Sequence, residues 1–149
     1  IPDAVKAWQS SQVLQIRHPN AVRPWQHVLE PLAGYCTLAQ RLWSNIELTG
    51  AYNFGPPTHE AATVQKVIEL ARATYGNGEV RYENASNGPH EAGRLVLETA
   101  KAQELLGVHP RLQLTEAVQR TMQWYKSQHN GADARALCEQ DIAAYEALP

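Results

Sequence analysis

The stretch HPNAVRPWQHVLEPLAGY, residues 18–35, carries the strongest fold signals in the chain. It opens with His18-Pro19-Asn20, which is typical of a turn. Apolar side chains at helical spacing follow, and they predict a helix over residues 30–43. Between the turn and the helix, Arg23 lies on a short extended segment beside Trp25. A guanidinium placed there offers a planar fork of donors that suits a diphosphate, although a surface Arg beside a packed Trp is the simpler account of the composition.

Helical and strand-like segments alternate along the rest of the chain, which predicts an α/β fold. Another helix is predicted to begin at Pro2, and four more are predicted over residues 63–75, 101–106, 116–128 and 132–148. The predicted strands cover residues 13–16, 51–54, 80–83 and 94–97. So few short strands cannot form a stable sheet alone. We therefore expect a partner outside the chain.

Composition excludes several classes of function. The 149 residues suffice for one domain with a buried core, and 44% of them are hydrophobic. A net charge of -2 gives no electrostatic reason to expect nucleic acid, and no apolar run is long enough to span a membrane. Cys36 and Cys138 lie far apart in predicted helices, so we expect two buried free thiols in a cytoplasmic protein.

The chain has no recognisable catalytic motif. No GxxGxxG or GxGxxG is present to hold a dinucleotide, and no Tyr is followed four residues later by Lys. His59-Glu60 and His90-Glu91 each lack the second His of a zinc site, and no GxSxG occurs. We therefore expect no catalytic residue, cofactor site or metal site in this chain.

Three polar residues besides Arg23 are candidates for ligand contact. Asn53 precedes a Gly-Pro turn and could donate to a phosphate or a sugar hydroxyl, or bond to nearby backbone. His90 lies in a polar loop and could bond a phosphate or be solvated. His27 is expected to be structural rather than a base. Trp8, Trp43 and Trp124 are expected in the core.

Residues 18–35 closely resemble a signature of the CDP-glucose 4,6-dehydratases, which are extended short-chain dehydrogenases/reductases. Further matches follow in order: Tyr52-Asn53-Phe54-Gly55-Pro56, Pro89-His90-Glu91-Ala92, Lys101-Ala102 with Leu106-Gly107, His109-Pro110-Arg111, Trp124-Tyr125-Lys126 and residues 138–145. The chain departs from the family where Val108 and Leu112 stand in place of Trp and where Glu98-Thr99 replaces an Asp-Cys pair. We expect these positions to serve packing or helix capping.

The resemblance implies the helix-rich C-terminal substrate-binding lobe of a Rossmann-type enzyme, with residues 1–149 as one domain and the Rossmann lobe missing. That N-terminal lobe would hold NAD, and the intact enzyme would be a homodimer that converts CDP-glucose to CDP-4-keto-6-deoxyglucose. By resemblance Arg23 binds the diphosphate, Asn53 and His90 line the phosphate region, Ile16 and Arg17 border the nucleobase, and Pro2 lies near the opening of the site.

Two other readings remain open. The chain could be the substrate lobe of another nucleotide-sugar epimerase or reductase, or a free-standing interaction module. Because it starts Ile1-Pro2-Asp3 without a Met and enters a helical pattern at once, we expect a fragment. Such a fragment would be inactive alone and would expose a large apolar face where the Rossmann lobe packs.

Overall fold

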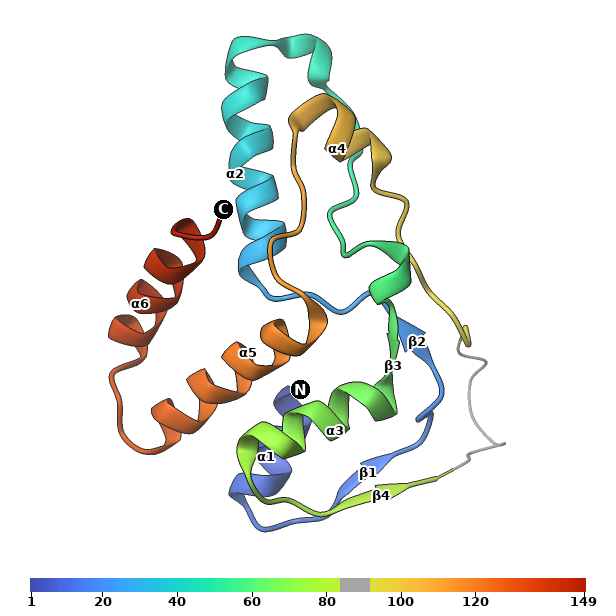
Figure 1. Cartoon of the computed structure of the whole chain (residues 1–149), viewed down its shortest axis with the longest axis vertical. Coiled ribbons are helices and arrows are strands. Elements are labelled where there is room, and N and C mark those ends of the chain that lie inside the picture. Colours follow the sequence, from blue (N-terminus) through green and yellow to red (C-terminus); the bar gives the residue numbers. More distant parts are fainter. Residues whose placement is uncertain (84–91) are drawn as a thin grey trace.

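The computed structural model describes residues 1–83 and 92–149. Its helices are α1 (Pro2–Gln9), α2 (Leu29–Ser44), α3 (Val64–Tyr75), α4 (Ala100–Leu106), α5 (Leu114–His129) and α6 (Ala134–Glu146), with short 3-10 turns η1 (Ile46–Leu48) and η2 (Thr58–Glu60). The strands are β1 (Leu14–Ile16), β2 (Val22–Arg23), β3 (Ala62–Thr63) and β4 (Val80–Tyr82). Helices α1, α3 and α5 gather at one end of the molecule, whereas α2 and α4 extend toward the other (Figure 1).

The strands form two small sheets within the described residues. β1 pairs in parallel with β4, with Ile16 opposite Tyr82, and β2 pairs antiparallel with β3, with Arg23 opposite Ala62. The predicted strand at residues 94–97 is reduced to a single bridge between Val22 and Arg94. Two-stranded sheets of this size depend on the helices packed around them.

The main core lies between α1, α3 and α5. Its buried side chains are Ala4, Val5, Trp8, Leu14, Val67, Ile68, Ala71, Val118 and Met122. Helix α3 contributes through its apolar face, and both of its ends are capped. The Thr63 hydroxyl accepts from the Lys66 backbone N–H at 3.1 Å, and Gly76 ends the helix at φ 96°.

A second, smaller cluster is built around a buried carboxylate, Glu30. Its Oε1 accepts the backbone N–H groups of Arg111 at 2.9 Å and Leu112 at 2.7 Å, and its Oε2 accepts the Tyr145 hydroxyl at 2.8 Å. Burial, and then this hydrogen bond, raise the pKa of Tyr145. Glu30 therefore ties the start of α2 to α6 and to the segment before α5.

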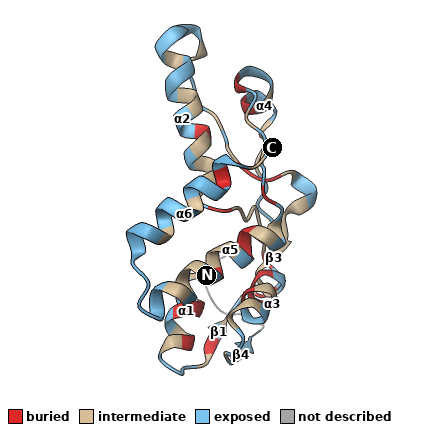
Figure 2. Ribbon diagram, turned by 60° about the vertical axis from the view of Figure 1, so that its left-hand side comes forward, coloured by how far each residue is buried: buried red, intermediate tan, exposed pale blue. Residues whose placement is uncertain are grey.

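Several predictions of burial are wrong for α2 and its surroundings. Trp43 is 93% exposed, Trp124 is only half-buried, and Cys36 and Cys138 are both exposed. Along α2 only Glu30 and Gly34 are buried, and the outer half of this helix is exposed in Figure 2. The helix forms as its apolar spacing predicts, but the described elements leave most of its surface uncovered.

The large exposed side chains of this region follow one side of α2 and continue into η1. They are Val28, Leu32, Tyr35, Trp43 and Ile46, and we call them the α2 stripe. The predicted strand at residues 51–54 has no regular secondary structure, because no strand lies beside it in the described part of the chain. Phe54 nevertheless packs closely on α2, with its ring 5.4 Å from that of Tyr35.

Candidate functional site

Arg23 ends β2 and is half-buried. Its Nη1 donates to the carbonyl oxygens of Val22 at 2.8 Å and Ala92 at 2.9 Å. The guanidinium therefore lies against the start of the segment at residues 92–98. His90 is outside the described residues, so its predicted place beside Arg23 stays a prediction.

Asn53 contacts the other end of the segment at residues 92–98. Its exposed side-chain amide donates to the Glu98 carbonyl oxygen at 3.0 Å, a contact with a distant part of the chain rather than with local turn backbone. A side-chain amide carries two N–H donors, so one remains for a ligand. Arg23 and Asn53 thus both contact the segment at residues 92–98.

Gln26 makes a third hydrogen bond from a side chain to a distant backbone carbonyl oxygen. Its Nε2 donates to the Phe54 carbonyl oxygen at 2.9 Å, and this bond joins the chain just after Arg23 to the residue after Asn53. The adjacent indole of Trp25 donates to the Ala62 carbonyl oxygen at 3.0 Å. The sequence pattern singled out the Arg-Pro-Trp-Gln-His run but gave no role to Gln26, since its partner is 28 residues away.

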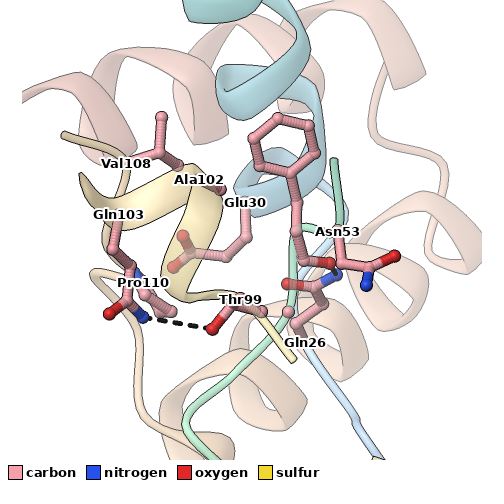
Figure 3. A pocket seen from close by; sticks show the side chains of 10 residues that line it. Gln26, Glu30, Asn53, Thr99, Ala102, Gln103, Val108 and Pro110 are labelled. Atoms are coloured by element: carbon pink, nitrogen blue, oxygen red, sulfur yellow. Dashed lines mark hydrogen bonds between the residues drawn. The ribbon is translucent and has the colours of Figure 1, made fainter. Parts of the chain in front are cut away.

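A small cavity of about 10 Å³ lies beside Gln26 and Asn53 (Figure 3). It is lined by Gln26, Glu30, Asn53, Phe54, Gly55, Thr99, Ala102, Gln103, Val108 and Pro110. Figure 3 shows Gln26 and Asn53 on one side of it, with the Gln103 amide donating to the Thr99 hydroxyl on the other at 3.1 Å. Such a volume holds about one water molecule. The cavity is too small for a sugar nucleotide.

Ile16 and Arg17 lie at the end of β1. Ile16 is half-buried opposite Tyr82, its carbonyl oxygen accepts the Glu83 backbone N–H at 2.8 Å, and Arg17 is exposed. The chain passes from β1 directly to β2 along one side of the molecule (Figure 1). Ile16 and Arg17 therefore share the side of the molecule that carries Arg23.

Pro2 lies apart from the other candidates. It is exposed in the first turn of α1 and faces a groove of about 560 Å³. The groove is lined by Ile1, Pro2, Gln26, His27, Val28, Leu29, Leu32, Thr121, Trp124, Tyr125, Cys138, Asp141 and Ile142. Neither Arg23 nor Asn53 lines it. Gln26 lines both this groove and the small cavity beside Asn53.

His27 has the surroundings of a structural histidine. It is buried, and its Nδ1 accepts the Leu29 backbone N–H at 3.4 Å at the start of α2. Burial lowers its pKa, with nearby Asp141 acting in the opposite direction. A ring held neutral in this way fits the structural role expected for it.

Two departures from the family pattern have structural roles here. The Glu98 carboxylate accepts the Ala100 backbone N–H at the start of α4, at 2.6 Å. Leu112 is buried in the cluster around Glu30, and Val108 lines the small cavity. These contacts agree with the helix-capping and packing roles expected for the positions.

The described residues carry no group of His, Cys, Asp and Glu side chains arranged to hold a metal. Among them, too, none of the helices combines the length and apolar character needed to cross a bilayer.

No protein-family model matches the chain. CDP-glucose 4,6-dehydratase of Salmonella typhimurium is 38% identical over 146 residues, which are 97% of this chain and 41% of that protein. The chain thus spans about two fifths of the length of this curated relative.

Two solved structures share the fold. UDP-glucose 4-epimerase from Stenotrophomonas maltophila, with bound NAD and formylated UDP-arabinopyranose, superposes with a TM-score of 0.72 at 17% identity, over 88% of this chain and 40% of that one. UDP-glucuronic acid 4-epimerase from Bacillus cereus, in complex with UDP-glucuronic acid and NAD, gives 0.68 at 16% identity, over 85% and 39%.

The fold is therefore that of the C-terminal part of extended short-chain dehydrogenases/reductases, as predicted. Within this class, the similarity along almost the entire chain confirms the resemblance to CDP-glucose 4,6-dehydratase.

Proposed function

We propose that this chain binds the nucleotide diphosphate of CDP-glucose in an NAD-dependent 4,6-dehydratase that makes CDP-4-keto-6-deoxyglucose. The observation that carries the proposal is the 38% identity to a CDP-glucose 4,6-dehydratase, together with the contacts of Arg23 and Asn53 on one segment. Arg23 supplies charge and a donor fork to the diphosphate, and Asn53 supplies an amide donor. The proposal also places His90 beside the phosphates, Ile16 and Arg17 beside the nucleobase, and Pro2 near the opening of the site.

The chain's part in the reaction is to bind and orient. Contacts to the nucleotide, remote from the reacting carbons, provide binding energy that holds the sugar in a productive position. NAD, when bound, supplies the acceptor and later the donor of a hydride at the sugar. The described residues offer no glycine-rich turn for NAD, so the proposal assigns NAD and the catalytic groups to an N-terminal Rossmann lobe.

The α2 stripe is the proposed contact surface for that lobe. Val28, Leu32, Tyr35, Trp43 and Ile46 are exposed along one side of α2, and Phe54 packs beside them. Several large apolar side chains exposed along one helix are typical of an interface. Because the chain spans 41% of its curated relative, the rest of such a protein is long enough to cover the stripe. We further propose a cytoplasmic homodimer that assembles mainly through the other lobe.

The alternative is the substrate lobe of an epimerase for another nucleotide sugar. It is favoured by the fold, since the two solved structures described above are both UDP-sugar epimerases. Comparing the affinities for CDP and UDP separates the two proposals, because they differ in the base rather than in the phosphates.

The test is a titration of CDP into the complete protein that carries this chain and into its Arg23→Ala variant. We expect the substitution to raise the dissociation constant of CDP by about 10- to 100-fold, because a charge-assisted contact to phosphate is lost. The matched control is Arg135→Ala, which removes an exposed Arg paired with Glu139 on α6 and leaves the affinity unchanged. Equal CDP affinity in Arg23→Ala and the parent protein would contradict the proposal, and a preference for UDP would favour the alternative.

A further inference from the structure

We propose that Gln26 is a positioning residue for the phosphate site, which holds the segment carrying Asn53 against the segment carrying Arg23. The inference rests on the proposed function and extends it to a residue that touches neither phosphate nor sugar. Its basis is the arrangement of three side-chain hydrogen bonds around the site.

These bonds connect three segments in a closed ring. Arg23 donates to Ala92, Asn53 donates to Glu98, and Gln26 donates to Phe54, in each case to a backbone carbonyl oxygen. The ring passes along residues 23–26, crosses to residues 53–54, then to residues 92–98, and returns to Arg23. Each segment is thus held to both of the others.

The three bonds differ in what a ligand does to them. Arg23 and Asn53 are the groups proposed to donate to phosphate through their further N–H donors, so a ligand contacts the same two side chains that bond Ala92 and Glu98. Gln26 is not proposed to contact phosphate, and its amide donates to the Phe54 carbonyl oxygen at 2.9 Å beside the small cavity. It therefore keeps the spacing of residues 23 and 53 when phosphate is bound.

The two segments that Gln26 joins, residues 23–26 and residues 53–54, are each also held by a contact with another element. The indole of Trp25 donates to Ala62 in β3, and Phe54 packs against Gly34 and Tyr35 of α2. Between these two anchors, Gln26 supplies the side-chain hydrogen bond that crosses from residue 26 to residue 54. Losing the donor leaves the Phe54 carbonyl oxygen without this partner and relaxes the position of Asn53.

The experiment uses the complete protein with Gln26→Leu and Gln26→Glu, and measures the affinities for CDP and for cytidine. Both variants lack the donor, and Gln26→Glu also keeps the size of the side chain, so it serves if the leucine variant does not fold. We expect the dissociation constant of CDP to rise by about 3- to 10-fold. The affinity for cytidine, which has no phosphate, stays within about twofold of the parent.

A double-mutant comparison separates positioning from general damage. If Gln26 acts through Asn53, then Gln26→Leu weakens CDP binding by less than about twofold in an Asn53→Ala background. Gln65→Leu is the control, since it removes a glutamine amide bonded to Glu69 on the surface of α3 and leaves both affinities unchanged.

Equal losses for CDP and cytidine, or full additivity with Asn53→Ala, would overturn the role of Gln26. Either result leaves the proposed function standing provided that Arg23→Ala still weakens CDP binding. If Arg23→Ala has no effect on CDP binding, the proposed function itself is wrong.

Discussion

Glu30 illustrates at the residue scale how much one buried side chain contributes to this fold. It is 5% exposed, and its carboxylate accepts two backbone N–H groups and one phenol hydroxyl from segments distant in the sequence. Glu60 makes a similar contact, accepting the Leu114 backbone N–H at 2.9 Å at the start of α5. Neither role was visible in the sequence, because a Glu that caps a distant segment has no local pattern.

We predict that Glu30→Ala destabilises the protein by about 3 kcal/mol, because the N–H groups of Arg111 and Leu112 and the hydroxyl of Tyr145 lose their acceptor together. Urea unfolding of the variant measures the change in the free energy of unfolding. The control, Glu139→Ala, removes an exposed carboxylate paired with Arg135 and is expected to cost less than about 1 kcal/mol. Similar costs for the two substitutions would argue against the role of Glu30.

At the scale of elements, local signals predicted α1, α3 and α4 well. Helix α3 covers Val64–Tyr75 where residues 63–75 were predicted, and α4 covers Ala100–Leu106 where residues 101–106 were predicted. Helix α5 begins at Leu114, two residues before the predicted start at residue 116, and the distant Glu60 carboxylate accepts a hydrogen bond from the Leu114 backbone N–H there. The strand expected at residues 51–54 failed for a related reason, since a strand needs a neighbour and none is present among the described residues.

The crossing of α2 with residues 51–55 leads to a prediction about Gly34. A Cβ at this position would lie 2.5 Å from the ring of Phe54, too close for any real contact. We predict that Gly34→Ala destabilises the protein by about 1–3 kcal/mol despite the better helix propensity of Ala, because the ring must move. Thermal and urea unfolding measure the change.

Gly93→Ala is the matched control, because a Cβ there meets no atom within 4 Å. It is expected to change the free energy of unfolding by less than about 0.5 kcal/mol. If Gly34→Ala were as stable as this control, α2 and Phe54 would not be packed as described.

For the molecule as a whole, the main feature is that some helices are well buried whereas others are largely exposed. α1, α3 and α5 enclose a core, whereas α6 buries only Tyr145 and α2 only Glu30 and Gly34. The sequence predicted the apolar spacing of α2 but placed Trp43 in a core, because periodicity shows that a face is apolar without showing what covers it. The proposed second lobe supplies that cover.

We predict that the isolated 149-residue chain binds an apolar fluorescent dye through the α2 stripe. A double variant, Tyr35→Ser with Trp43→Ser, is expected to lower the dye signal at least about twofold, because both side chains belong to one exposed apolar surface. Leu95→Ser with Leu105→Ser removes two exposed apolar side chains outside the stripe and should change the signal little. Equal signals from the two double variants would contradict a concentrated patch.

The parallel pairing of β1 with β4 has a consequence for how the molecule forms. Leu14–Ile16 and Val80–Tyr82 come together only after the chain has passed through α2 and α3, so closing this pair carries a large entropic cost. The edge that bears Ile16 is therefore expected to assemble late and to open early. In native-state hydrogen exchange, its amides would lose their protection before those of α3 and α5.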